Sequence, residues 1–561
     1  MTQHPEFPPE TLTFGQPEQF QGWMYYPKEP LNEHPAYRSF LGRVNKVAKA
    51  TWAANPQFEP RPYQCETAAL YCCRRENICA GSQGVGKTLI VAFTIAGLYP
   101  ALGKMRPGAV QVVAPSILSA HSRWLVDLQR VPELQGLVEV ITNRKEWEQA
   151  KAPVWVYHRE LLMLKVDKSR RRPWLAQELA RFSPPSLLVI DEVHNFKPDN
   201  QRSKALFYLR SRSRRCLALS GTITDARLDL IQHTCQLVYR QGWPYDSSQA
   251  FRRSMGCKEI VRSKTNLSDE EDFEGETKRT RYLDFVALNR LGDYFQVLTK
   301  YVHRLSLDQP KVRNHCRVPK RVDVLHPLTP SLVQQLRHRQ ILSEHHGWIE
   351  QLLQYGGDKH IFSLFQPLLE LCWLPPEGIH SAKFQVLAEI IQANPKTGVF
   401  VSSIDTGRWL TEALNHCFPG QVVRLYAQDP HAEPKRLKQE QREQILERLM
   451  FDAHIKVGVL SLNLASESID LHNLSSLCFW GVTWSSLQLA QSIARAVRPG
   501  CPYTEVQIHW LYHQGLLDEH QVQLLLEKMR AGKRLLDYDP YLTSQEPEDN
   551  QMKKILEILV R

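Results

Sequence analysis

A glycine-rich segment has the residue types and spacing that bind nucleotide phosphates. It reads Gly81-Ser-Gln-Gly-Val-Gly-Lys-Thr88, and it lies between a short apolar run and a helix-like run. Glycines let backbone N–H groups converge on phosphate oxygens at a helix N-terminus. In this pattern the lysine reaches the β- and γ-phosphates, and the next hydroxyl is offered to Mg²⁺. We therefore expect a site for ATP and Mg²⁺ formed by Gly81, Gly84, Gly86, Lys87 and Thr88.

Two adjacent carboxylates follow another apolar run. Residues 187–190 lead into Asp191-Glu-Val-His194. A carboxylate at the end of a buried strand can hold Mg²⁺, while its neighbour orients and deprotonates an attacking water. Asp191 and Glu192 are assigned to these two roles. Leu219-Ser-Gly-Thr222 ends a further expected strand, and its hydroxyls could link this metal site to a moving neighbour.

A third set of candidate residues lies far downstream in Gln491-Ser-Ile-Ala-Arg495-Ala-Val-Arg498. On a continuous helix, Gln491, Arg495 and Arg498 would share one face. Two arginines in a domain separate from the phosphate loop are what arginine fingers supplied across a cleft require. We therefore predict catalytic roles for this group beside Lys87 and Glu192.

The elements that must position these residues alternate between apolar runs and amphipathic stretches. In 56–240 the expected strands are 110–114, 154–157, 187–190 and 216–219; in 381–535 they are 398–401, 422–425, 456–460, 477–480 and 507–511. Such alternation predicts parallel sheets with helical crossovers, and hence two α/β domains. Residues 241–380 are mainly helical in pattern. Residues 1–55 are expected to be an N-terminal arm or small elaboration, and 536–561 a C-terminal tail.

Composition limits the class of protein and its partners. The chain has 561 residues, 43% hydrophobic and 23% charged, which is ordinary for a globular protein. Its 70 Lys+Arg against 59 Asp+Glu give a net charge of +11, which favours polyanionic partners. The longest apolar stretch, 89–102, is interrupted by Pro100 and is too short to span a bilayer. The spacing of the cysteines predicts reduced thiols and no structural zinc.

The order of the motifs resembles superfamily-two helicase-type motors and, among them, the Swi/Snf-type DNA translocases. Arg61-Pro-Tyr-Gln64 is similar to the family's adenine-reading element, and 113–119 with Trp124 is similar to a strand and turn that contact DNA. The segment 461–471 occupies the place of the fifth motif, with Ala465, Ser466 and Ser468 where glycines are usual, and Ile223 replaces a usual proline. The resemblance covers residues 57–535 and implies two tandem RecA-like lobes.

The resemblance also implies roles for residues outside the phosphate loop. Gln64 would face the adenine base, and Asp470 would contact the ribose or position an arginine finger. Candidate nucleic-acid contacts by motif position are Ser116, Tyr157, Ser402 and Ser461.

The expected function is a DNA-dependent ATPase that translocates along double-stranded DNA. Two alternatives stay open: a strand-separating helicase, and an ATP-gated DNA-binding scaffold that recruits a nuclease or another effector. We expect no membrane partner. The expected compartment is the cytoplasm of a bacterium, with a phage setting also considered, or the nucleus in a eukaryote.

Overall fold

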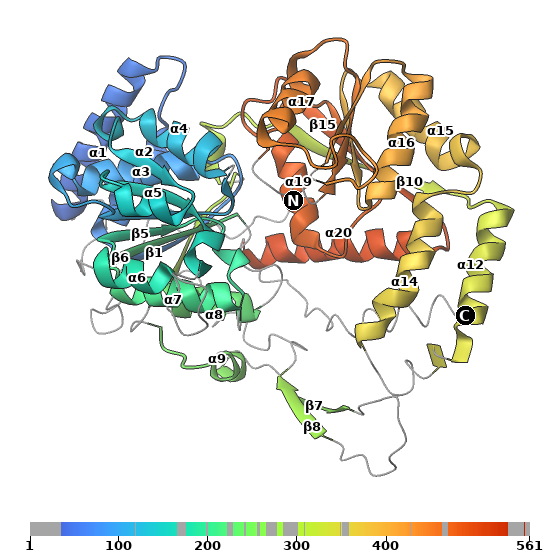
Figure 1. Cartoon of the computed structure of the whole chain (residues 1–561), viewed down its shortest axis with the longest axis horizontal. Helices are drawn as coiled ribbons and strands as arrows, with labels where there is room; N and C mark the ends of the chain where they lie inside the picture. The colour runs from blue at the N-terminus through green and yellow to red at the C-terminus, as the bar shows by residue number, and fades with distance from the viewer. Residues whose placement is uncertain are drawn as a thin grey trace. The chain divides into compact units, whose positions relative to one another are not determined.

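The structure is a computed structural model of the chain (Figure 1). It describes residues 35–536 and Ile555, except 118, 165–174, 198–199, 222–227, 240–242, 255–258, 265–277, 284–300, 308, 348, 351–357, 427 and 463–468. The chain divides into two compact units. The first comprises Met1–Met255, Arg290–Cys316 and Leu536–Pro540, and the second Gly256–Asn289, Arg317–Leu535 and Tyr541–Arg561.

A seven-stranded sheet forms the centre of the first unit. In spatial order its strands are β3 (Val138–Ile141), β4 (Val154–His158), β2 (Val110–Ala114), β5 (Leu187–Ile190), β6 (Arg215–Ser220), β1 (Glu76–Gly81) and β9 (Val302–Leu305). All neighbouring strands are parallel. Strands β2 and β5 are wholly buried, as their predominantly apolar sequences predict for a sheet covered on both faces.

Helices accompany the strands of the first sheet (Figure 1). They are α1 (Pro35–Ala54), α2 (Pro62–Cys73), α3 (Lys87–Leu98), α4 (Val126–Gln129), α5 (Arg144–Gln149), α6 (Leu175–Phe182), α7 (Gln201–Arg212), α8 (Leu228–Val238), α9 (Ser248–Ser254) and α11 (Pro310–Arg313). Helix α1 lies in the expected N-terminal arm. It packs against α2 and α3, and Val44 of α1 occupies the space that a Cβ at Gly97 of α3 would need. Residues 1–34 of that arm lie outside the described residues.

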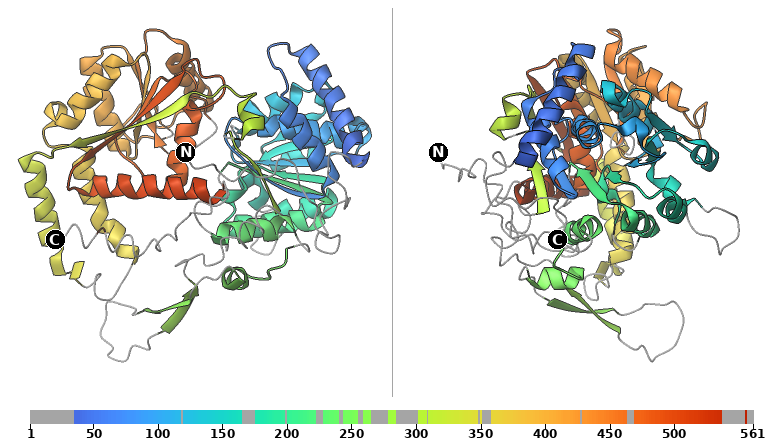
Figure 2. Two further views of the ribbon diagram at one scale, coloured as in Figure 1. Left: turned by 180° about the vertical axis from the view of Figure 1, so that it is seen from behind. Right: turned by 90° about the vertical axis from the view of Figure 1, so that its left-hand side faces the viewer.

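The second unit is built on a six-stranded sheet (Figure 2). Its order is β10 (Lys320–Leu328), β15 (Glu505–His513), β14 (Ser476–Phe479), β11 (Thr397–Val401), β13 (Val457–Ser461) and β12 (Val422–Leu425), all parallel. The helices are α12 (Leu332–Glu344), α14 (Asp358–Trp373), α15 (Ala382–Ala393), α16 (Ile404–Cys417), α17 (Gln439–Phe451), α19 (Ser486–Ala496) and α20 (Leu517–Leu536). The predicted fold class, two RecA-like parallel-sheet lobes, is confirmed.

The interval 241–380 also contributes strands that the sequence pattern did not predict. Strand β9 joins the first sheet beside β1, and β10 joins the second beside β15. Strand β10 carries charges and Pro327, which an edge strand tolerates because one side of its backbone needs no sheet partner. Strands β7 (Glu259–Lys264) and β8 (Lys278–Leu283) form an antiparallel pair.

The C-terminal tail is described at Ile555 alone beyond residue 536. That side chain is buried in an apolar cluster with residues of α14 and α20. Among the described helices, we find none that combines the length and apolarity needed to cross a membrane.

Candidate active site

The carboxyl ends of three neighbouring strands bring the predicted nucleotide residues together. Strands β5, β6 and β1 are adjacent and parallel, with Ile190 opposite Ala218 and Ala80 opposite Ser220. Parallel strands end at one edge of the sheet, so the loops that follow them meet there. The phosphate loop follows β1 and Asp191 follows β5. The predicted acidic pair and phosphate loop therefore share one edge of the first sheet.

Glycine conformations shape the phosphate loop. Gly84 and Gly86 have φ angles of 85° and 79°, a region that L-residues with a Cβ rarely adopt. Helix α3 begins directly after Gly86, at Lys87 and Thr88, both of which are buried. The Lys87 Nζ donates to Gly81 O at 2.8 Å, so the lysine side chain folds back over its own loop.

The Arg61–Gln64 segment forms hydrogen bonds with the same loop. Gln64 is 4% exposed; its Nε2 donates to Val85 O at 3.2 Å and its Oε1 accepts from the Arg61 N–H at 3.0 Å. The Tyr63 hydroxyl also donates to Val85 O, at 2.9 Å. A Cβ at Gly86 would collide with Gln64 Nε2. Gln64 thus holds the loop directly, and its second N–H and second lone pair are the capacity left for a base.

Burial sets the electrostatics of Lys87 and Asp191. Desolvation lowers the pKa of Lys87, and the Glu192 and Asp191 carboxylates oppose that shift. Burial, followed by the neighbouring Glu192 charge, raises the pKa of Asp191, against the effects of Arg123, Lys87 and the Trp124 hydrogen bond. Burial destabilises the charged forms of both Lys87 and Asp191. Additional groups of opposite charge beside them would therefore be strongly favoured.

Glu192 is held in an unusual backbone conformation. Among the described residues it is the sole non-glycine with a clearly positive φ, 47°. Its Oε2 lies 3.3 Å from His194 Nδ1, and the same ring nitrogen lies 2.8 Å from Ser220 Oγ. Burial lowers the pKa of His194, which favours the neutral ring. Sparsely populated backbone conformations persist mainly where function requires them, so this geometry supports a mechanistic role for Glu192.

The His194–Ser220 contact is a detail that spacing alone did not predict. His194 lies in the turn that follows β5 and Ser220 ends β6, and only the pairing of β5 with β6 makes them neighbours. The expectation that a hydroxyl of 219–222 would reach the acidic motif fits Ser220. Thr222 and Ile223 lie outside the described residues.

The donors at this edge fit Mg²⁺ and a triphosphate. A carboxylate and a hydroxyl, from Asp191 and Thr88, are the hard oxygen ligands that Mg²⁺ prefers. Gly84 and Gly86 leave the backbone without side chains that would obstruct phosphate oxygens, and Lys87 supplies a positive charge.

In the second unit the structure separates Arg498 from the helix that carries its predicted partners. Gln491 and Arg495 lie one turn apart on α19 and are 8% and 6% exposed. The prediction that all three share one helical face is wrong for Arg498, because α19 ends at Ala496. Arg498 instead lies in the following turn, where its Nη1 is 3.2 Å from Asp470 Oδ1.

Asp470 connects the fifth-motif segment to this turn. Burial acts to raise the pKa of Asp470, but the hydrogen bond from His472 and the Arg498 charge outweigh it and hold the pKa below its usual value. The backbone N–H of Leu471 donates to Arg495 O at 3.1 Å. These contacts fit a finger-positioning role for Asp470. Residues 463–468, which include Ala465, Ser466 and Ser468, lie outside the described residues.

The predicted nucleic-acid contacts in the first unit have two different environments. Ser116 follows β2, is half-buried, and its Oγ accepts from the Ser119 N–H at 3.1 Å. Tyr157 on β4 is 1% exposed, and its hydroxyl donates to Gln111 Oε1 at 2.8 Å. The Tyr157 ring is therefore part of the core and is not available to a DNA strand in this structure.

Trp124 also lies in the core rather than at a DNA-facing surface. It is fully buried, and its indole N–H donates to Asp191 Oδ2. Spacing gave no signal for this role, because Trp124 and Asp191 are far apart in the sequence.

The predicted contacts of the second unit lie at strand ends. Ser402 follows β11 and Ser461 ends β13, its neighbour in the sheet. Both residues are half-buried. Ser402 Oγ has no hydrogen-bond partner among the described residues, which leaves its hydroxyl able to bind a ligand oxygen after a small rearrangement.

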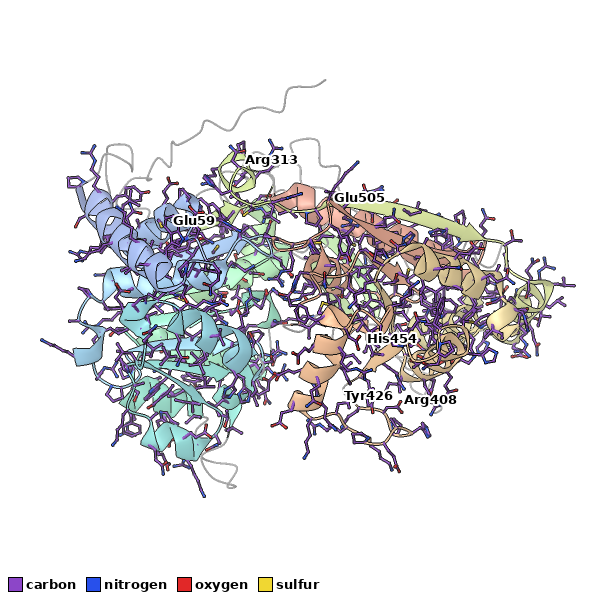
Figure 3. The ribbon with its side chains drawn as sticks, turned by 90° about the horizontal axis from the view of Figure 1, so that it is seen from above. Glu59, Arg313, Arg408, Tyr426, His454 and Glu505 are labelled. Carbon is purple, nitrogen blue, oxygen red and sulfur yellow. The ribbon has the colours of Figure 1, made fainter. Side chains whose placement is uncertain are left out.

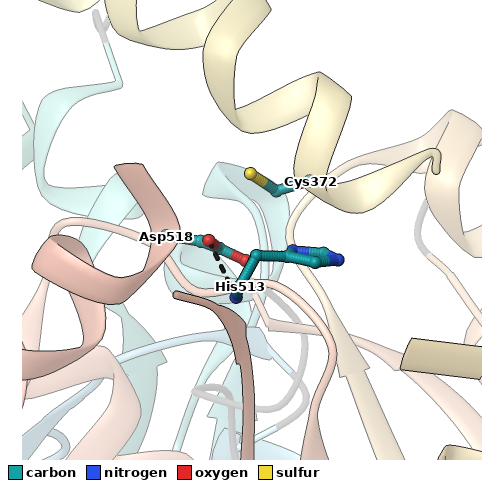
Figure 4. A group of neighbouring side chains, drawn as sticks. All are labelled: Cys372, His513 and Asp518. Atoms are coloured by element: carbon teal, nitrogen blue, oxygen red, sulfur yellow. Dashed lines mark hydrogen bonds and ion pairs between the residues drawn. The ribbon is translucent and has the colours of Figure 1, made fainter. Parts of the chain in front are cut away.

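Another buried polar group is an ion-pair network. Cys372, His513 and Asp518 have potential metal-ligand atoms within 4.8 Å of one another (Figure 4). His513 Nδ1 lies 3.0 Å from Asp518 Oδ2, and Lys383 Nζ lies 3.3 Å from the same oxygen. Lys383 already supplies the positive charge that the buried carboxylate needs. We therefore assign these residues to the stability of the second unit and not to a metal centre.

Comparison with known proteins gives one family match and two informative structures. Residues 382–500 match the family described as helicase conserved C-terminal domain. No curated protein matches the chain. The Sulfolobus solfataricus SWI2/SNF2 ATPase core in complex with dsDNA is 17% identical, with a TM-score of 0.34, over 85% of this chain and 93% of that one. S. cerevisiae Dbp5 bound to RNA and ADP BeF3 is 13% identical, with a TM-score of 0.49, over 93% and 98%. The match over residues 382–500 supports the helicase part of the expected resemblance.

Proposed function

We propose that this chain is a DNA-stimulated ATPase of the Swi/Snf type that translocates along double-stranded DNA. The observation that carries the proposal is the grouping of Lys87, Asp191 and Glu192 at one edge of the first sheet. The helicase C-terminal domain over 382–500 supplies the second half of such a motor.

Each residue of the first unit has a distinct task in this proposal. Lys87 binds the β- and γ-phosphates, and Thr88 and Asp191 hold Mg²⁺. When bound, Mg²⁺ neutralises charge on the phosphate oxygens. Glu192 orients the attacking water and accepts its proton, and His194 with Ser220 fixes the Glu192 carboxylate.

The second unit would supply positive charge for the same reaction. We propose that Arg495 and Arg498 serve as arginine fingers, that Gln491 assists them, and that Asp470 positions Arg498 through its ion pair. Asp470 is therefore a finger-positioning residue in this proposal, and a ribose contact is its alternative.

Double-stranded DNA is the proposed track. The net charge of +11 favours a polyanion, and Ser116, Ser402 and Ser461 are the proposed phosphate contacts. Tyr157 is not retained as a direct contact because it is buried. Contacts to phosphates carry little base information, so we expect weak sequence preference and an affinity that falls steeply with salt.

The decisive experiment measures ATP hydrolysis with and without duplex DNA. Lys87→Ala, Glu192→Gln and Arg498→Ala should each abolish most of the DNA-stimulated turnover. Arg408→Ala is the matched control, because Arg408 is an arginine of the second unit paired with a surface aspartate (Figure 3). Wild-type turnover in all three test variants would refute the proposal.

Two further assays separate the remaining alternatives. Displacement of a third strand from a DNA triplex indicates translocation on the duplex, whereas unwinding of a fork without displacement would favour a strand-separating helicase. Tight ATP-dependent DNA binding with negligible hydrolysis would instead select a scaffold that recruits a nuclease or another effector.

A further inference from the structure

Cys316 ends the Arg290–Cys316 segment of the first unit and contacts the Arg61–Gln64 segment, which is hydrogen-bonded to the phosphate loop. Cys316 is 3% exposed. Its Sγ lies 2.7 Å from Arg61 Nη1 and 3.2 Å from the Tyr63 hydroxyl. Arg61 and Tyr63 belong to the segment whose Gln64 holds the phosphate loop. The residue that ends the Arg290–Cys316 segment is thus connected to the proposed nucleotide site through side-chain contacts.

The donors and acceptors in these contacts have a definite order. The Tyr63 hydroxyl has one proton and donates it to Val85 O at 2.9 Å. Towards Cys316 it can therefore only accept, so the thiol S–H is the donor. Arg61 has only N–H groups to offer, so Sγ accepts from it. Hydrogen bonds consequently run from Arg61 to Cys316, from Cys316 to Tyr63, and from Tyr63 to the phosphate loop.

Tyr63 keeps the proton that its hydrogen bond to the loop requires. Burial raises the pKa of Tyr63 well above its ordinary range. The phenol therefore keeps its proton at neutral pH and remains a donor to the Val85 carbonyl.

The chain that ends at Cys316 also contacts the other end of the loop. Ser82 N–H donates to Leu305 O at 2.8 Å, and Arg304 Nη1 donates to Ala80 O at 2.9 Å. The segment 302–316 therefore contacts the start of the loop directly through β9. It is linked to the later part of the loop through Cys316 and Tyr63. Arg313, three residues before Cys316, and Glu59, two residues before Arg61, are labelled in Figure 3.

We propose that Cys316 is a positioning residue for ATP binding, which fixes the phosphate loop through Tyr63 and Arg61. The inference rests on the proposed ATP-binding function. Because Arg317 begins the longest segment of the second unit, the same contacts link the chain that leads into that segment to the conformation of the loop. Cys316 itself does not touch the nucleotide in this proposal.

Three variants in the full-length chain test the role of Cys316. Cys316→Val removes the thiol and keeps an apolar side chain, Cys316→Ser keeps a donor and an acceptor, and Tyr63→Phe removes the hydroxyl. Cys316→Val and Tyr63→Phe should each raise the calorimetric Kd and the KM for ATP about fivefold, which is the size of effect that the loss of a buried hydrogen bond implies. The kcat should change less than about twofold, because the contact serves binding in ground and transition states alike. Serine should restore most of the affinity.

A double variant and a control distinguish positioning from general destabilisation. The double variant Cys316→Val/Tyr63→Phe should bind ATP with about the affinity of whichever single variant binds it more weakly. The reason is that the two substitutions interrupt the same chain of hydrogen bonds. Cys216→Val is the control, because Cys216 is a fully buried cysteine on β6 of the same unit.

Each outcome decides the inference. Unchanged ATP affinity in Cys316→Val and Tyr63→Phe, additive losses in the double variant, or a loss with serine as large as with valine would overturn it. A wild-type chain that neither binds nor hydrolyses ATP would overturn the proposed function as well. A wild-type chain that binds ATP with unaffected variants would overturn the positioning role alone.

Discussion

The indole Nε1 of Trp124 donates a 2.9 Å hydrogen bond to Oδ2 of Asp191, and both side chains are buried. The Glu192 backbone provides a further contact, because its N–H donates to Asp191 Oδ1 at 3.0 Å. The carboxylate proposed to hold Mg²⁺ is thus oriented by a buried residue that is distant from it in the sequence. Orientation of this kind limits the rotamers of a ligand and stabilises its charged form.

Trp124→Phe should weaken the binding of Mg²⁺ at the proposed active site. Without the indole donor the raised pKa of Asp191 rises further, so the acid limb of the pH–rate profile should move to higher pH. The Mg²⁺ concentration for half-maximal ATPase activity should rise about tenfold, since a hydrogen bond to a charged group contributes about 1.5–3 kcal/mol. Steady-state ATPase titrations with Mg²⁺ at several pH values measure both effects.

Trp155→Phe is the matched control for that measurement. Trp155 is a buried tryptophan of the same sheet, and its Nε1 has no hydrogen-bond partner among the described residues. Equal shifts in the two variants would mean that the Trp124 hydrogen bond does not act on Asp191.

Gly86→Ala should abolish nucleotide binding by distorting the phosphate loop. The substitution places a Cβ on a backbone with φ of 79° and directs it against Gln64 Nε2. Backbone strain of this kind costs about 1–3 kcal/mol before any collision is counted. Gly136→Ala is the control, since Gly136 has a φ of 71° and nothing lies within 4 Å of its added Cβ. Comparable ATP affinity in the two variants would contradict the close approach of Gln64 to the loop.

Asp470→Asn should impair hydrolysis in the same way as Arg498→Ala. The Asp470 side chain is 52% exposed, so its ion pair with Arg498 contributes little to stability. The thermal unfolding midpoint should therefore stay close to that of the wild type while kcat falls. The double variant Asp470→Asn/Arg498→Ala should have a kcat no lower than that of Arg498→Ala alone. Clearly additive losses of kcat would exclude a positioning role for Asp470.

Acid should destabilise the second unit through Asp518. Burial alone would raise the pKa of Asp518, but the Lys383 charge and the hydrogen bonds from His513 hold it at about 2, below its ordinary value of 3.8. A lowered folded-state pKa stabilises the protein above the unfolded-state value, and this contribution disappears as pH falls through the folded-state value. The wild type should thus lose on the order of 2 kcal/mol of stability from this group between pH 4 and pH 2.

Asp518→Asn tests that dependence in urea titrations. At pH 7 it should destabilise the second unit by about 3–5 kcal/mol, because it leaves the Lys383 charge buried without its partner. The difference from the wild type should shrink below pH 4. Asp405→Asn, in a surface pair, should show neither effect, and a constant difference across the pH range would refute the assignment.

The sequence predicted the elements whose signals are local. Strands at 110–114, 187–190 and 422–425 have the predicted bounds, and the phosphate loop and acidic pair lie at strand ends as expected. These features follow from short apolar runs and from residue types at fixed spacing, which depend on neighbouring positions only. Strand β10 gave no comparable signal, because a largely exposed strand does not require a continuous apolar run.

The sequence by itself determined that this chain has a glycine-rich loop of the phosphate-binding pattern, an acidic strand end and two α/β units. Only the tertiary structure decided which residues support these features. Trp124 forms a hydrogen bond with Asp191, Ser220 with His194, and Cys316 with Tyr63. The tertiary structure also decided that Arg498 lies beyond its helix and that Tyr157 belongs to the core. The physical reason is that these contacts join residues distant in sequence, so they depend on strand order and packing, which no local pattern encodes.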